Sequence, residues 1–193
     1  MRKARRRLAL YDTMAAMMDP LVPPTSHTAL REQAAHRLVV ELTTRRRWLA
    51  VAESCTGGLL GATITDVPGA SAVFFGGVVS YANAAKEGWL GVDPRLLAAH
   101  GAVSAEVATA MTQGLLVLPE VDLACAVTGI AGPSGGTPEK PVGTVFIAVG
   151  DRRGVEAVRH QFPGDRTAVR GATVAQALKL LVERVRNDRC DLA

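Results

Sequence analysis

The sequence predicts an α/β fold, a three-layer α/β/α sandwich around a mixed, mostly parallel sheet. Short apolar runs alternate with helical stretches in the first two thirds of the chain, a pattern typical of parallel strands joined by crossover helices. Two adjacent β-branched runs follow and indicate a hairpin, which makes the sheet mixed. The 193 residues suffice for one such domain. We expect this domain at 26–193, after a flexible, basic and proline-containing tail at 1–25.

The first elements follow from local patterns. Leucines and alanines at four-residue spacing predict a helix over 27–45. The apolar run 48–53 predicts a buried strand, and a helix is expected from Thr56 or Gly57 to about Asp66. After the turn "VPGAS", the run 72–81 predicts a second strand.

The later elements carry clearer start and stop signals. A short helix is expected in "ANAAKEGWLG", and the next begins at the cap Asp93-Pro94 and stops at Gly101. Ser104 caps a helix over about 105–117, and Asp165 caps the long final helix. The remaining apolar runs predict strands at 121–128, 142–150 and 155–162.

Charge and composition limit the class of protein. The net charge is +4, but five of the 22 basic residues lie in residues 1–7, which leaves 17 basic against 18 acidic residues in the rest of the chain. With only 4% aromatic residues, a nucleic-acid partner is not expected. The apolar run after the basic start is too short for a signal peptide or a membrane span. Three cysteines without a C-x-x-C motif indicate neither disulfides nor a metal site, and we expect a cytoplasmic protein.

Polar residues stand at the carboxyl ends of the three predicted parallel strands. These ends are Glu53-Ser54, Ser80-Tyr81 and Thr128-Gly129. Ligands of open α/β sheets bind outside this edge of the sheet, so the three ends point to one site.

The stretch "AESCTGGLL" offers a nucleophile at the first strand end. Ser54 lies where a strand turns into a helix, and the N–H groups of the helix start can hold developing negative charge there. Thr56, Gly57 and Gly58 form this start, and the glycines permit close approach of a substrate. The alternative is that Ser54 or Thr56 merely caps the helix.

The two residues beside Ser54 have different expected roles. Cys55 is expected to pack toward the core. Glu53 either orients Lys86 or binds the backbone, and the sequence leaves both roles open.

A serine nucleophile needs a base, and the sequence favours a lysine. The chain has no P-loop, dinucleotide fingerprint or G-x-S-x-G motif. No histidine lies at a predicted strand end, although a Ser-His-Asp triad assembled from distant positions stays open. Lys86 follows the second strand end among apolar neighbours, where desolvation lowers the pKa of a lysine. Tyr81 could relay or orient the proton; the alternative is a solvated Lys86 paired with Glu87.

Two further segments add binding groups. The long connection 128–144 is either functional or a mobile surface loop, and backbone amides at Thr128-Gly129 could meet an anion or a carbonyl. Arg166 and Arg170 lie one helical turn apart, which suits a phosphate. The alternative is that their stems pack on the sheet with the charged heads in solvent.

Together these motifs resemble the CinA C-terminal domain family, the nicotinamide-nucleotide amidases, over about residues 28–187. The matching stretches are "AESCTGG", "SYANAAKEGWLGV", "GAVSAEVA", "AVTGIAGPSGGTPEKPVGTV" and "FPGDRTAVR". The longer family members carry an additional N-terminal molybdopterin-binding-like domain, and we expect this chain to be a stand-alone amidase without it.

The resemblance implies hydrolysis of the carboxamide of nicotinamide mononucleotide to nicotinic acid mononucleotide and ammonia. Ser54 matches the nucleophile, Lys86 and Tyr81 the proton-handling partners, and Thr128 an active-site threonine. Arg166 and Arg170 fall where the substrate phosphate is expected. It implies a small-molecule nucleotide substrate, no cofactor and a homodimer. Two alternatives remain: an amidase for another phosphorylated amide, or a non-catalytic interaction protein linked to competence or DNA damage.

Overall fold

The computed structural model describes residues 27–187, and the predicted tail at 1–25 and Cys190 lie outside this range. The strands are β1 Leu49–Glu53, β2 Phe74–Val79, β3 Leu123–Gly129, β4 Thr144–Asp151 and β5 Gly154–Gln161. The α-helices are α2 His27–Arg45, α3 Leu59–Thr65, α4 Asn83–Leu90, α5 Pro94–His100, α6 Ala105–Leu116 and α7 Arg166–Asn187. A 3₁₀ turn, Ala70–Ala72, precedes β2.

The five strands form one mixed sheet in the order β2-β1-β3-β4-β5. β1 is central to the predicted site because it pairs in parallel with both β2 and β3. β4 runs antiparallel to β3 and forms the predicted hairpin with β5. The parallel half thus arises where helices alternate with strands, and the antiparallel half where they do not, as the sequence predicts.

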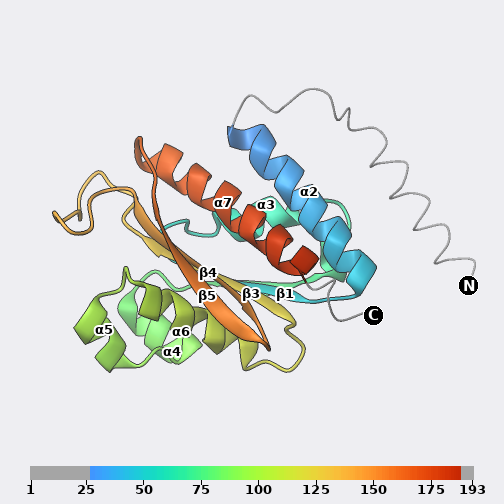
Figure 1. Ribbon diagram of the computed structural model, residues 1–193, viewed down its shortest axis with the longest axis horizontal. Helices are drawn as coiled ribbons and strands as arrows, with labels where there is room; N and C mark the ends of the chain where they lie inside the picture. Colours follow the sequence, from blue (N-terminus) through green and yellow to red (C-terminus); the bar gives the residue numbers. More distant parts are fainter. Residues whose placement is uncertain (1–26, 188–193) are drawn as a thin grey trace, which may run out of the picture.

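Helices cover both faces of the sheet, which confirms the three-layer architecture (Figure 1). α2, α3 and α7 lie on one face, and the larger core cluster, with Leu38, Leu60 and Leu178, fills the space between them and the sheet. α4, α5 and α6 lie on the other face over a second cluster that includes Leu90 and Met111. Burial of these side chains, each contributing roughly 1.5–3 kcal/mol, fixes the strand ends relative to the helices.

One predicted boundary is wrong in an informative way. α3 begins at Leu59, two or three residues later than expected. Gly57 and Gly58 have φ of 58° and 94°, a left-handed conformation that glycine adopts readily. Ser54–Gly58 is therefore a separate turn between β1 and α3, not the first turn of the helix.

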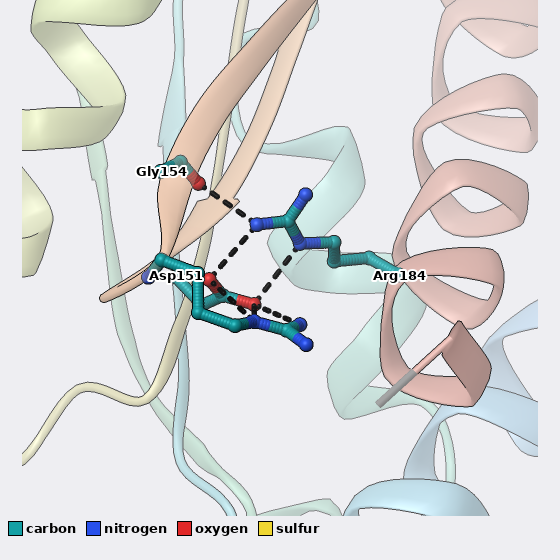
Figure 2. Close-up of polar contacts among 4 residues, drawn as sticks. Asp151, Gly154 and Arg184 are labelled. Atoms are coloured by element: carbon teal, nitrogen blue, oxygen red, sulfur yellow. Dashed lines mark hydrogen bonds and ion pairs between the residues drawn. The ribbon is translucent and has the colours of Figure 1, made fainter. Parts of the chain in front are cut away.

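The end of the sheet opposite the parallel strand ends is held by a buried carboxylate (Figure 2). Asp151, at the end of β4, accepts hydrogen bonds from Arg184 on α7 at 2.9 and 3.0 Å and from Arg153 at 2.6 Å. Arg184 also donates to the carbonyl of Gly154 at 3.0 Å. The network therefore ties the end of α7 to the β4–β5 turn.

Over residues 27–187, no helix combines the length and the apolar character that a membrane crossing requires.

Candidate active site

The carboxyl ends of the three parallel strands meet at one edge of the sheet. Glu53 stands opposite Val79 of β2 on one side and Val127 of β3 on the other. The N–H of Ser54 donates to the carbonyl of Val127 at 3.0 Å. Ser54 is thus fixed as the first residue beyond the sheet, as the sequence predicts.

Lys86 reaches this edge from α4 and contacts Ser54. Its Nζ lies 3.2 Å from Ser54 Oγ, and it also donates to the carbonyls of Ser80 at 2.9 Å and Tyr81 at 3.3 Å. Lys86 is only 1% exposed, so the alternative of a solvated lysine paired with Glu87 is wrong. Burial lowers the pKa of Lys86, which makes the neutral amine more accessible at ordinary pH.

Cys55 does not compete with Ser54 as a nucleophile. Its side chain is buried in the core cluster on the α3 face, as expected. Burial, the main effect, raises the pKa of the thiol to about 12. Because the thiolate is the nucleophilic form, Cys55 is inert at neutral pH.

Glu53 binds the backbone, which resolves its open role. Its carboxylate accepts hydrogen bonds from the N–H groups of Gly58 at 3.0 Å, Leu60 at 3.0 Å and Gly61 at 2.8 Å. No side chain caps α3 from its N-cap position, Gly58. The alternative in which Ser54 or Thr56 caps the helix is therefore wrong, and Glu53 holds the helix start instead.

These bonds narrow the choice of backbone donors for an anion. The N–H of Gly58 is taken by Glu53, and the N–H of Gly57 donates to the carbonyl of Ser54. Within residues 27–187, no oxygen accepts from the N–H groups of Cys55 or Thr56. The backbone donors left directly after Ser54 are thus the N–H groups of Cys55 and Thr56.

Two buried hydroxyl groups, on residues near Ser54 and Lys86 in the sequence, lack hydrogen-bond partners. Thr56 Oγ1 and Ser80 Oγ make no hydrogen bond to any described residue. Both residues are fully buried. Buried polar atoms are rarely left unpaired in native proteins, so these hydroxyls are candidate contacts for a substrate or water.

Arg170 and Arg166 approach the turn from the first turns of α7. Arg170 donates through Nε and Nη2 to the carbonyl of Thr56, at 3.2 and 2.7 Å. Arg166 donates to the carbonyl of Gly132 at 3.0 Å and to the hydroxyl of Tyr81 at 2.8 Å. These acceptors are neutral, and no carboxylate in the described part of the chain hydrogen-bonds either guanidinium group. Neither guanidinium group is therefore engaged in an ion pair with a carboxylate among the described residues.

Tyr81 presents two different groups to the site. Its carbonyl accepts from Lys86, whereas its hydroxyl accepts from Arg166. The side chain is 57% exposed. The hydroxyl thus lies on the arginine side of the site, and a role for it in proton transfer stays a prediction.

The connection after β3 is fastened at several points. Arg166 holds the carbonyl of Gly132, Arg159 holds that of Glu139 at 2.7 Å, and Lys140 donates to the carbonyl of His100 at 2.8 Å. These ties favour an ordered wall of the site over a mobile loop.

Thr128 and Gly129, the last two residues of β3, both make contacts within the fold. The hydroxyl of Thr128 donates to the carbonyl of Ala102 at 2.8 Å. A Cβ at Gly129 would lie 2.7 Å from Val145 Cγ2, so glycine is needed there for the approach of β4. Substrate contacts of either residue stay predictions.

None of the three histidines whose side chains the structure describes supports a triad. His100 lies 3.4 Å from Glu106, and His160 stacks on Phe162 in the β5 region. Neither these nor His36 hydrogen-bonds Ser54. Over residues 27–187, no three metal-ligating side chains gather as a metal site requires.

Two hollows lie away from this edge of the sheet. One, of about 520 Å³, lies beside the Asp151 network and is lined by Arg153, Arg184 and Glu156. The other, of about 470 Å³, lies between α2 and α7. Neither is lined by Ser54 or Lys86, so these two hollows do not coincide with the Ser54–Lys86 pair.

Comparison with known proteins agrees with the motifs. Residues 31–185 match the CinA C-terminal domain. The chain is 56% identical over 137 residues to a CinA-like protein of Geobacter sulfurreducens and 51% identical over 137 residues to one of Thermotoga maritima. Each match covers 71% of this chain and 33% of the relative, so the chain spans about a third of the length of these curated relatives.

Solved structures resemble the whole layered unit. The competence/damage-inducible protein CihA of Agrobacterium tumefaciens is 40% identical, with a TM-score of 0.78 over 86% of this chain and 98% of that chain. A CinA superfamily protein of Klebsiella pneumoniae is 36% identical, with a TM-score of 0.78 over 81% of this chain and 98% of that chain. With a family match across most of its length and relatives above half identity, the chain belongs to the CinA C-terminal domain family.

Proposed function

We propose that the protein hydrolyses the carboxamide of nicotinamide mononucleotide to nicotinic acid mononucleotide and ammonia. The observation that carries this proposal is the 3.2 Å contact between Lys86 Nζ and Ser54 Oγ at the carboxyl edge of the parallel strands. A buried lysine with a lowered pKa beside a serine hydroxyl is a nucleophile with its base. A protein that only binds partners has no need of this pair.

Acylation begins with neutral Lys86. Its amine takes the proton of Ser54 as Oγ attacks the carboxamide carbon, and a tetrahedral intermediate forms. The carbon–nitrogen bond then breaks, and Lys86 returns the proton to the leaving nitrogen, which departs as ammonia. Water next attacks the acyl-enzyme while Lys86 takes its proton and passes it to Ser54 Oγ, so that the free acid and the starting enzyme are restored.

The oxyanion of the intermediate needs hydrogen-bond donors. The N–H groups of Cys55 and Thr56 follow the nucleophile directly, and no oxygen among the described residues accepts from them. We therefore assign the oxyanion to these two donors. Loss of one such donor costs roughly 2.7–4 kcal/mol of transition-state stabilisation in a comparable enzyme.

The substrate phosphate is assigned to Arg166 and Arg170. Both guanidinium groups donate only some of their N–H groups to neutral oxygens, so other N–H groups remain for an anion. Arg170 also holds the carbonyl of Thr56 in the nucleophile turn. Phosphate binding at Arg170 is thereby coupled to the geometry around Ser54.

Ammonia release from nicotinamide mononucleotide by the purified protein tests the proposal. Product acid is identified by chromatography, and nicotinamide riboside is the matched substrate without phosphate. We expect release from the mononucleotide and little from the riboside. Release from neither compound would overturn the proposed function, and equal release from both would remove the phosphate assignment.

A further inference from the structure

We propose that Glu53 is a positioning residue that holds the nucleophile turn, Ser54–Gly58, in its reactive geometry. The inference rests on the proposed function only for the identity of the nucleophile. Glu53 touches none of the reacting groups in that proposal. It acts through the backbone N–H groups of Gly58, at the end of the turn, and of Leu60 and Gly61, in the first turn of α3.

Both carboxylate oxygens of Glu53 accept hydrogen bonds from backbone N–H groups. Oε2 accepts from Gly58 and Leu60, and Oε1 accepts from Gly61. The residue is 2% exposed. A buried carboxylate needs such compensation because its isolated charge is costly to desolvate.

Gly61 is the third backbone donor to the carboxylate, with its N–H 2.8 Å from Oε1. A Cβ at Gly61 would lie 3.4 Å from that oxygen, an ordinary van der Waals distance, so this hydrogen bond does not depend on the absence of a side chain. The glycines that the turn itself needs are Gly57 and Gly58, whose φ angles are positive.

The turn has few other anchors on its helix side. At the strand side, the N–H of Ser54 is fixed to Val127, and within the turn Gly57 donates to Ser54. Arg170 holds the carbonyl of Thr56. The N–H of Leu59 donates to the carbonyl of Thr56 at 3.3 Å. Among the described residues, Glu53 is the hydrogen-bond partner that ties the exit of the turn, at Gly58, back to β1.

A carboxylate is required, and an amide of the same shape does not suffice. A glutamine at this position has one acceptor oxygen and one NH₂ donor. If its oxygen replaces Oε2, the NH₂ faces the N–H of Gly61; if it replaces Oε1, the NH₂ faces those of Gly58 and Leu60. At least one N–H then meets another donor, and the turn must move.

The role is positional and not a tuning of the base. Glu53 does not hydrogen-bond Lys86, and the lowered pKa of Lys86 comes from its burial. A Glu53 variant should therefore lower the rate at every pH without moving the pH midpoint. Misplacement of reacting groups by about 1 Å costs roughly 100-fold in rate.

The test measures the reactivity of Ser54 without the nucleotide. An alkyl fluorophosphonate forms an Oγ–P bond with an activated serine as fluoride leaves, and the serine proton passes to Lys86. Labelling rates are followed by intact mass and peptide mapping from pH 6 to 10. The variants are Glu53→Gln, Glu53→Asp and the control Asp151→Asn, which alters another buried carboxylate at the opposite end of the sheet.

We expect Glu53→Gln to label Ser54 about 100-fold more slowly than wild type with an unchanged pH midpoint. Glu53→Asp keeps the charge and should recover part of the rate, and it carries the test if Glu53→Gln does not fold. Asp151→Asn should label at the wild-type rate. Wild-type rates in both Glu53 variants, or an equal loss in Asp151→Asn, would overturn the inference.

The same experiment separates this inference from the proposed function. Rapid labelling of wild type, slowed in the Glu53 variants, without ammonia release from the mononucleotide would support the role of Glu53 and overturn the substrate. A wild-type protein that is not labelled at Ser54 would overturn both.

Discussion

Replacement of Lys86 by methionine removes the amine and keeps the length of the side chain. The activity prediction is direct, because loss of a general base typically costs about 10²–10⁴-fold. We expect Lys86→Met to lose at least 100-fold in kcat for ammonia release. A loss of less than tenfold would refute the assignment of Lys86 as the base.

The stability of this variant should depend on pH in a defined direction. Three hydrogen bonds of the neutral amine are lost: its two N–H groups donate to the carbonyls of Ser80 and Tyr81, and its lone pair accepts from the Ser54 hydroxyl. At about 1 kcal/mol for each hydrogen bond, the variant should be about 3 kcal/mol less stable at high pH, where the wild-type amine is neutral whether folded or unfolded.

At lower pH the folded wild type is destabilised by the burial of the protonated Lys86 amine, and Lys86→Met has no such group. The pKa of Lys86 is lowered in the folded protein by burial, so between the folded pKa and about 10.5 the unfolded chain binds more protons. The stability of wild type therefore rises with pH across this window, by about 1.4 kcal/mol for each unit of pKa depression. The free energy of unfolding of wild type should therefore increase relative to that of Lys86→Met from pH 7 to 10.

Urea unfolding of both proteins at pH 7, 8.5 and 10 measures this difference. The free energy of unfolding of wild type minus that of Lys86→Met should increase with pH. A difference that stays constant or decreases would refute the claim that burial depresses the pKa of Lys86.

Three further outcomes follow from the same geometry. Cys55→Ala should keep most of the wild-type kcat because the thiol is buried and its pKa is raised to about 12; an inactive variant with unchanged thermal melting would contradict the choice of nucleophile. Arg170→Ala should raise KM for the mononucleotide far more than for the riboside, and equal effects on both would remove its phosphate role. Asp151→Asn should destabilise the protein by about 2 kcal/mol at pH 7 without lowering kcat. Burial of Asp151 acts to raise its pKa, but hydrogen bonds from Arg184 and Arg153 outweigh burial and hold the pKa at about 2. The stabilisation by the ionised carboxylate should therefore be lost as pH falls from about 4 toward 2. Urea midpoints of wild type that show no such loss would contradict this role of Asp151.

The order of elements could be predicted because each has a local signal. Caps at Asp93 and Ser104 mark helix starts, and both side chains accept the expected backbone hydrogen bonds. The start of α3 could not be predicted, because whether glycines belong to a helix or to a turn depends on φ angles that the sequence does not display. At Gly57 and Gly58 both angles are positive.

The candidate site was predictable as far as it follows from strand ends. Ser54 and Lys86 were both found, since parallel strands bring their carboxyl ends together and apolar neighbours indicate a buried lysine. Which of its two possible roles Glu53 has could not be predicted, because its partners are backbone N–H groups, which every residue except proline has. The adjacent glycines Gly57 and Gly58 are the one available signal, as their positive φ angles permit the turn.

The central claim is that Ser54, activated by Lys86, forms an acyl-enzyme. Hydroxylamine added during turnover of nicotinamide mononucleotide competes with water for such an intermediate. We expect wild type to convert part of the product to the hydroxamate at the expense of the acid, and Ser54→Ala to form neither. Acid formation without any hydroxamate, or hydroxamate formed by Ser54→Ala, would contradict it.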